Sequence, residues 1–348
     1  MSVTVTHRVP PGLRDRVGLM SSSPLRVCVV GAGAVGGMIG TRMAAAGIPT
    51  TALARGATAA ALGRHGWRLR EAGRTLAAPC RVAHDAHDLG EQDVVVIAVK
   101  AQALVALAAT LKPLLGSDTV LVPAMNGVPW WFTEGLGGPL EGVALDAVDP
   151  GGAIASALPP SQVLGCVVHL SASAPSPGLS EHGAGNRLVL GDPTQPAGAR
   201  LETVGGLLET ASFEVVRSTR IHTDVWFKLW GNLTMNPISV LTGAPMDRIL
   251  DDPLVEQFIV SVMQEAAEIG ARIGCPIDQS PAERMAVTRR LGSVRTSMLQ
   301  DADAGRSIEL DALVTAVVEL GALVDVPTPQ TSTLLGLTRL AARTRGLY

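Results

Sequence analysis

The feature that most constrains the fold is a glycine-rich turn between a short apolar strand and a helix. Residues 25–30 (LRVCVV) are apolar and rich in β-branched side chains, which is typical of a strand covered on both faces. The sequence GAGAVG follows at 31–36, and 38–46 has a helical pattern that ends at Gly47 and Pro49. A second strand is predicted at 50–54. This order predicts a βαβ unit and therefore a parallel sheet.

The same turn predicts a ligand. Gly31 permits the tight turn, Gly33 lets the backbone approach a pyrophosphate, and Gly36 permits close packing of helix on strand. The start of the helix, at Ala34 and Val35, then faces the negative charge. Three glycines at this spacing are a weak signal alone, but their place inside a βαβ unit favours dinucleotide binding over an ordinary turn.

Two basic residues bear on the choice of cofactor. The second strand ends in ALARG at 52–56 without the acidic residue that usually binds the ribose of NAD. Arg55 could instead pair with a 2′-phosphate, which favours NADPH, although a solvated surface arginine fits the same position. Lys100 ends the apolar strand predicted at 93–99, where ligands bind in such sheets, and could contact a phosphate or a substrate.

Composition excludes several classes of protein. Net charge is −3 and the arginines are scattered, so the basic surface of a nucleic-acid binder is missing. The longest apolar stretch, 94–111, is interrupted by Lys100 and Gln102, which favours a buried strand and helix over a membrane span. Four scattered cysteines without a CxxC pair predict neither a disulfide framework nor a zinc site. We therefore expect a cytoplasmic protein with no metal.

The chain is long enough for two domains. Residues 1–24 lack the apolar core of a secretory signal, so we expect a flexible extension, with Met20 as an alternative start. We expect a doubly wound α/β domain of the Rossmann type over 25–195 and an all-α domain over 196–348. Further strands are predicted at 119–124, 163–170 and 187–190, a loop at 171–185, and helices at 201–210, 222–235, 252–273, 282–302, 308–323 and 329–344.

The most informative helix carries three polar residues at a spacing of four, namely Lys228, Asn232 and Asn236. They share one edge of a segment otherwise filled with Trp, Phe, Leu and Met, which predicts a buried helix. A buried lysine needs a partner or has a lowered pKa, and then it can donate a proton near neutral pH. A lysine paired with a carboxylate fits the spacing equally well. Asn236 precedes Pro237, which predicts that the helix ends or kinks there.

Three further polar residues are candidates for ligand binding, but each could equally have a purely structural role. Asn126 follows a predicted strand and precedes Gly127, and Asn-Gly is a turn signal in its own right. Ser297 could supply a hydroxyl ligand. Glu309 begins a predicted helix, where the helix dipole favours an acidic residue in any case. Composition alone would place Ser297 and Glu309 on the surface.

Taken together, the motifs resemble the ketopantoate reductase (2-dehydropantoate 2-reductase) family. The resemblance runs from residue 25 to about residue 345, in family order, and its later part is highly specific. It is carried by GAGAVGG at 31–37, Arg55, VK at 99–100, NG at 126–127, WFKLWGNLTMNPIS at 226–239 and SMLQDADAGRSIE at 297–309.

The resemblance implies an NADPH-dependent reductase with its site in the cleft between the domains. Lys228 would be the general acid that protonates the ketone oxygen, and Glu309 would anchor Lys228 or the nicotinamide. The resemblance alone implies a homodimer formed through the helical domain. By the same resemblance Asn232, Asn236 and Ser297 would bind a small 2-oxo acid, Asn126 would reach the substrate or the nicotinamide ribose, and Lys100 and Arg55 would favour NADPH.

One segment departs from the family pattern. Residues 127–168 contain Trp130 and Trp131 and a Gly/Pro-rich stretch longer than usual. This segment could wall the substrate site or be a surface insertion. The leading expectation is reduction of ketopantoate to pantoate, in pantothenate synthesis. The alternatives are reduction of another 2-oxo acid or a bulkier carbonyl, and a dinucleotide-binding sensor without turnover.

Overall fold

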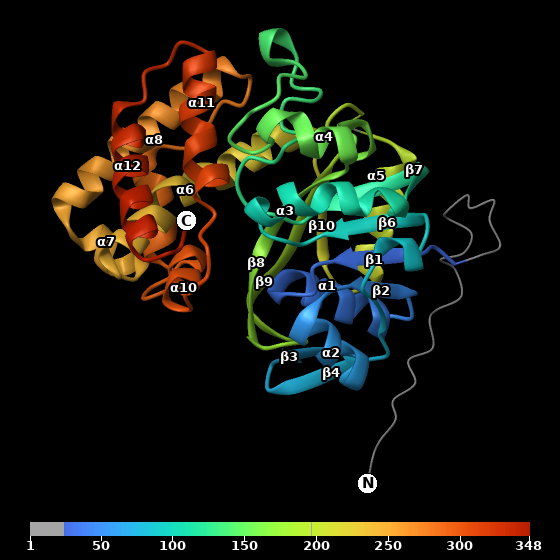
Figure 1. Cartoon of the computed structure of the whole chain (residues 1–348). Helices are drawn as coiled ribbons and strands as arrows, with labels where there is room; N and C mark the ends of the chain where they lie inside the picture. Colours follow the sequence, from blue (N-terminus) through green and yellow to red (C-terminus); the bar gives the residue numbers. More distant parts are fainter. Residues whose placement is uncertain (1–23, 196) are drawn as a thin grey trace.

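The computed structural model describes residues 24–195 and 197–348, which form an α/β part and a helical part (Figure 1). The extension expected at the N-terminus, including Met20, lies outside the described residues except for residue 24. In the described residues, every helix is too short or too polar to span a bilayer. These residues also contain no group of His, Cys, Asp and Glu side chains that could hold a metal ion.

The first sheet is parallel and contains the strand that precedes the glycine turn. Its order is β5-β2-β1-β6-β7, and every neighbouring pair runs parallel. This confirms the predicted βαβ unit and the doubly wound class. The elements are β1 (Val27–Val30), α1 (Ala34–Ala45), β2 (Thr50–Leu53), α2 (Gly56–His65), β5 (Arg81–Ala83), β6 (Gln92–Ile97), α3 (Ala101–Leu107) and β7 (Leu115–Pro123).

A second sheet, absent from our expectations, packs on the other side of α1. Its order is β10-β9-β3-β4, and β8 pairs with β9. Helix α1 contacts strands of this sheet, and Gly40 permits the approach, because a Cβ there would lie 2.4 Å from the Trp67 ring. The strands are β3 (Trp67–Glu71), β4 (Arg74–Ala78), β8 (Gly165–Ser176), β9 (Leu179–Gly191) and β10 (Glu214–Arg217).

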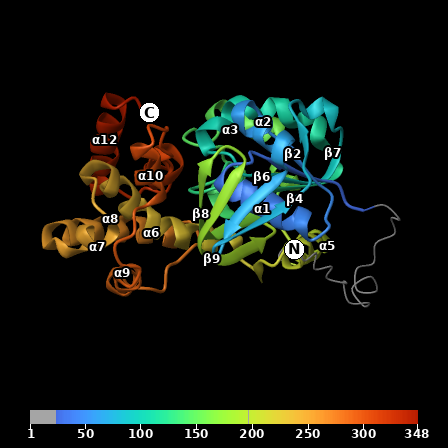
Figure 2. The same cartoon turned by 90° about the horizontal axis from the view of Figure 1, so that it is seen from below.

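The prediction of a loop at 171–185 is wrong. These residues form most of the long antiparallel hairpin of β8 and β9, which faces the helical part (Figure 1, Figure 2). Backbone pairing between the strands needs no particular side chain, and the pairing continues past the register shifts near Ser171. The Ser171 hydroxyl also accepts a hydrogen bond from the Ala184 N–H at 2.8 Å.

The pairing of β10 leads us to propose that the passage between the two parts comes later in the chain than the expected 195/196. Helix α5 (Ala199–Thr210) leads into β10, which pairs parallel with β9 and so belongs to the second sheet. A boundary at 195/196 would divide this sheet from its own strand. We therefore propose a boundary near Arg220, immediately before α6 (Ile221–Thr242).

The helical part is built around α6, which packs against α8, α10 and α12. The helix expected at 282–302 is two helices, because Gly292 has a φ of +73° and Thr296 caps a new start by accepting from the Leu299 N–H. The remaining elements are α7 (Met246–Asp251), α8 (Pro253–Arg272), α9 (Pro281–Arg289), α10 (Ser297–Asp303), a π-helical turn (Asp311–Thr315), α11 (Ala316–Leu323) and α12 (Pro329–Thr344).

Asn236-Pro237 predicts that the helix ends or kinks there, and α6 does not end at Pro237. It continues to Thr242 and stops at Gly243, which has a φ of +71°. Proline removes one N–H from the helix but keeps a helical φ, and the second half of α6 is buried by its neighbours. Tertiary packing therefore carries the helix through a residue that would break it in isolation.

Candidate active site

A cavity of about 440 Å³ lies between the two parts and brings most of the predicted site residues together. One wall comes from the glycine turn, the end of β6, the loop after β7 and strand β8, and the other comes from α10 and the segment that follows it. The lining residues include Gly33, Ala34, Val35, Val99, Lys100 and Asn126 from the α/β part, and Ser297, Gln300, Asp301, Arg306 and Glu309 from the helical part.

The glycine turn has the shape that a dinucleotide needs. Gly31 has a φ of +87°, and a Cβ there would lie 2.5 Å from Val99 Cγ1. A Cβ at Gly36 would lie 2.1 Å from the Gly31 carbonyl oxygen, whereas one at Gly33 would meet nothing within 4 Å. Helix α1 has no side-chain cap at Gly33. Its first N–H groups therefore lack a side-chain acceptor, which suits a bound phosphate.

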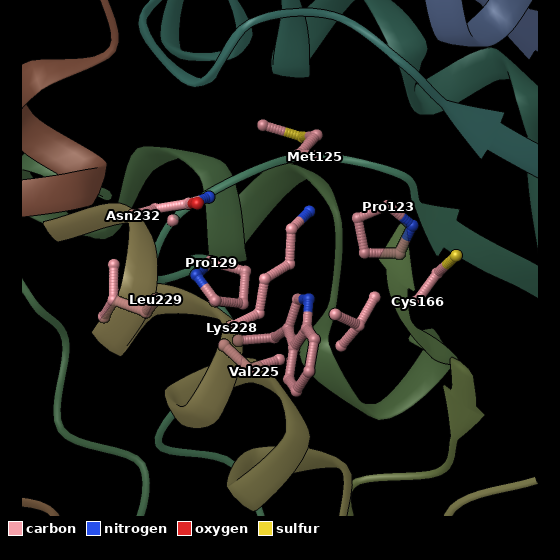
Figure 3. A pocket seen from close by; sticks show the side chains of 11 residues that line it. Pro123, Met125, Pro129, Cys166, Val225, Lys228, Leu229 and Asn232 are labelled. Atoms are coloured by element: carbon pink, nitrogen blue, oxygen red, sulfur yellow. The ribbon is translucent and has the colours of Figure 1, made fainter. Parts of the chain in front are cut away.

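Lys228 projects from α6 to the junction of the two parts. Its Nζ donates to Asn126 Oδ1 at 2.7 Å. Figure 3 shows Lys228 extending from the helix toward the loop that carries Met125, with Asn232 on the same helix. Burial lowers the pKa of Lys228 from 10.5 to about 8, and the opposing charge of Glu309 offsets only part of this effect.

Glu309 joins the two parts near Lys228. Its Oε1 accepts from the Ala101 N–H at 3.2 Å, so it caps α3 of the α/β part from the helical part. Burial raises the pKa of Glu309, while the positive charges of Lys100 and Lys228 act in the opposite direction. The carboxyl therefore sits within the electrostatic reach of the lysine rather than on the surface, where composition alone would place it.

Lys100 lines the cavity, but its ammonium already contacts residues of the helical part. Its Nζ lies 2.6 Å from Asp301 Oδ2 and donates to the Ser307 carbonyl oxygen at 2.9 Å. Arg306 Nε lies 2.9 Å from the other oxygen of Asp301. Asp301 thus holds one cation from each part of the chain at the wall of the cavity.

Two predicted residues, Arg55 and Asn236, lie away from this cavity, and a third, Ser297, is an exposed residue at its wall. Arg55 is exposed at the carboxyl end of β2 and does not line the cavity. Asn236 is buried one turn beyond Asn232 and lines neither the large cavity nor the smaller one beside Lys228. Ser297 lines the large cavity but is otherwise exposed.

A smaller cavity beside Lys228 contains residues that our reading of the sequence did not assign. Its wall combines Lys228 and Asn232 with apolar side chains such as Cys166 (Figure 3), and Trp131 also lines it. The unusual Trp130–Trp131 pair was a sequence signal for part of this wall. Cys166 carried no signal, because its place opposite α6 depends on the β8–β9 hairpin.

Comparisons with known proteins find matches to both parts of the chain. The family model described as "Ketopantoate reductase PanE/ApbA" matches residues 27–134, and "Ketopantoate reductase PanE/ApbA C terminal" matches 220–342. The 2-dehydropantoate 2-reductase of Mesorhizobium japonicum is 41% identical over 325 residues, which cover 93% of this chain and 100% of that protein.

Solved structures show the same relationship. A candidate ketopantoate reductase from Ralstonia solanacearum MolK2 is 57% identical with a TM-score of 0.91, covering 94% of this chain and 100% of that one. The 2-dehydropantoate 2-reductase of Methylococcus capsulatus is 25% identical with a TM-score of 0.78, covering 92% and 98%. A D-mandelate dehydrogenase solved with NADH and anilino(oxo)acetate shares the fold at 18% identity and a TM-score of 0.79, covering 92% and 99%. The chain therefore belongs to the ketopantoate reductase family of dinucleotide-dependent oxidoreductases.

Proposed function

We propose that the chain reduces ketopantoate to pantoate with NADPH, and that Lys228 is the proton donor. One observation carries the proposal: the Lys228 ammonium, with a pKa lowered to about 8, meets Asn126 at 2.7 Å beside the cavity that the glycine turn opens into. The 41% identical 2-dehydropantoate 2-reductase supports the choice of substrate. The reaction would serve pantothenate synthesis.

The proposed roles follow from the chemistry of carbonyl reduction. Bound NADPH supplies the hydride that reaches the carbonyl carbon. Negative charge then develops on the ketone oxygen, where the Lys228 ammonium stabilises it and transfers a proton. The neutral amine regains its proton from solvent. Asn126 holds the Lys228 ammonium in place without the full negative charge that would raise its pKa.

The remaining residues would bind and orient the two reactants. Asn232 lies beside Lys228, and Ser297 faces the large cavity from the start of α10, so both are placed to hold polar groups of a 2-oxo acid. Asn236 stays a proposed substrate ligand on the strength of the family resemblance. Glu309 is proposed to position α3 and Lys228 around the nicotinamide end of the cofactor.

Preference for NADPH is proposed to come from two cations. Arg55 follows β2 and is exposed, so it is free to meet the 2′-phosphate. Lys100 would exchange its contact with Asp301 for a phosphate, or would keep that contact and hold the cleft closed around the cofactor. The glycine turn, with Ala34 and Val35 at the start of α1, would bind the pyrophosphate.

The deciding experiment follows NADPH oxidation by the purified protein with ketopantoate and with a panel of other 2-oxo acids. We expect ketopantoate to be the best substrate, with kcat/KM of about 10⁴ M⁻¹s⁻¹ or more. A better rate with another 2-oxo acid would keep the proposed reaction and change the proposed substrate. Tight NADPH binding without turnover of any carbonyl would indicate the sensor instead.

Self-association is a separate proposal. We propose a homodimer formed through the helical part, as the family resemblance implies. A ketopantoate reductase from Staphylococcus aureus, 20% identical, is described as dimeric. Light scattering of the purified chain would give a mass of about twice the monomer if the proposal holds.

A further inference from the structure

Among the described residues, one indole N–H lacks an acceptor. All five tryptophans lie in the described residues, and four of them donate Nε1–H to a backbone carbonyl. Trp131 is 1% exposed, and its Nε1 is buried with no hydrogen-bond partner among the described residues. The four satisfied bonds are Trp67 to Thr50 at 3.4 Å, Trp130 to Leu158 at 3.1 Å, Trp226 to Ala266 at 3.1 Å and Trp230 to Met263 at 2.8 Å.

The Trp131 indole is fixed in place, so it cannot turn toward another acceptor. Gly165 leaves room for the ring, because a Cβ there would lie 2.7 Å from Trp131 Cη2. The ring also packs edge-on against His222, with centroids 5.9 Å apart. A buried donor without an acceptor costs free energy in a folded protein, so its retention in a rigid setting calls for an explanation.

The position of Trp131 supplies that explanation. It lines the small cavity that also contains Lys228 and Asn232, and the rest of the wall is mostly apolar, with Pro129, Cys166, Val225 and Leu229 among its residues. The cavity has a volume of about 20 Å³, which is the space of one small group such as a water molecule or a hydroxyl. A ligand whose carbonyl meets Lys228 would therefore place a neighbouring small group against Trp131.

We propose that Trp131 is a specificity-determining residue, whose Nε1–H donates to the terminal hydroxyl oxygen of the substrate. This inference rests on the proposed function and deepens it. In ketopantoate the hydroxyl oxygen is only three bonds from the carbonyl carbon, so one small molecule can reach Lys228 and Trp131 together. Asn232, in the same wall, offers a second polar partner to that hydroxyl.

The first test pairs a variant with two substrates. Trp131→Phe removes the N–H and keeps most of the ring. The substrates are ketopantoate and 3,3-dimethyl-2-oxobutanoate, in which a methyl group replaces the hydroxymethyl group. We expect the variant to raise KM for ketopantoate about 10-fold with kcat nearly unchanged, and to change KM for the analogue by about 2-fold or less.

The matched control is Trp130→Phe. Trp130 is the adjacent buried tryptophan, but its N–H is already bonded to Leu158. We expect this variant to lower the melting temperature without discriminating between the two substrates. Equal losses on both substrates in Trp131→Phe would overturn the inference and leave the proposed function standing. Failure of the wild-type enzyme to reduce ketopantoate would overturn the proposed function itself, and the inference with it.

A second measurement uses the wild-type protein and does not depend on the folding of a variant. Indole N–H signals in ¹⁵N-labelled protein are followed while pantoate is added in the presence of NADP⁺. We expect the Trp131 proton to move downfield as it gains an acceptor, while the four bonded indoles stay in place. An unchanged set of indole signals at a pantoate concentration that inhibits the enzyme would overturn the inference.

Discussion

Lys228 Nζ donates to Asn126 Oδ1 at 2.7 Å, and the two residues lie 102 positions apart in the chain. Lys228 belongs to α6, and Asn126 belongs to the loop after β7. The partner is a neutral amide, and no carboxylate of the described residues forms an ion pair with this lysine. Burial can therefore lower the pKa of Lys228 to about 8, close to the pH at which a proton donor works best.

Replacement of Lys228 by alanine should remove the proton donor and leave the cofactor cavity intact. We expect kcat to fall by about 100- to 10,000-fold, the usual contribution of general acid catalysis, while the Kd for NADPH changes little. Steady-state kinetics and a fluorescence titration with NADPH measure the two quantities. Lys112→Ala, at an exposed position of the α/β part, is the control and should keep normal turnover. Near-normal turnover in Lys228→Ala would remove the proposed acid.

The rate should depend on pH through Lys228. The protonated form is the donor, so kcat/KM should fall as the pH rises through about 8. Asn126→Asp would place a negative charge at the present hydrogen-bond partner and favour the ammonium. We expect that variant to move the alkaline limb upward by about 1 unit or more, whatever its effect on the maximum rate. A limb that stays at the same pH in the variant would contradict the assignment to Lys228.

Arg55 should contribute to the discrimination between the two cofactors. Loss of a charge-assisted contact with the 2′-phosphate should weaken NADPH binding about 10-fold in Arg55→Ala and leave NADH binding nearly unchanged. Titration of each cofactor gives both Kd values. Arg64→Ala, at an exposed position of helix α2, which begins directly after Arg55, should change neither. Equal losses for NADPH and NADH in Arg55→Ala would sink the 2′-phosphate assignment.

Two substitutions in the glycine turn should separate an effect on stability from an effect on NADPH binding. A Cβ at Gly36 would lie 2.1 Å from the Gly31 carbonyl oxygen, so Gly36→Ala should lower the free energy of unfolding by about 1–3 kcal/mol. A Cβ at Gly33 has open space, and its φ of −81° lies outside the left-handed region that favours glycine, although its ψ of −148° lies outside the usual β range. Gly33→Ala should therefore lower the melting temperature less than Gly36→Ala does and should weaken NADPH binding, because the added methyl group lies at the cavity. Normal NADPH affinity in Gly33→Ala would argue against a pyrophosphate at this turn.

Patterns among residues close together in the sequence were sufficient to predict many of the helices and strands. The strand, the glycine turn and α1 follow from residues that are neighbours in the chain, and the polar edge of α6 follows from a spacing of four. The same reasoning placed α8 and α12 almost at their observed bounds. Such elements are predictable because backbone hydrogen bonds within a helix, and the alternation along a strand, depend on local order.

Contacts between distant segments decided the rest. Residues 171–185 became strands because each arm of the hairpin supplies the other's backbone partners, and α6 passes Pro237 because its neighbours bury it. Lys100 looked like a free cation in the sequence, yet the fold sets it against Asp301, 201 positions away. The sequence likewise could not show that the Trp131 N–H lacks an acceptor among the described residues. Whether a buried donor has an acceptor depends on all the residues that pack around it.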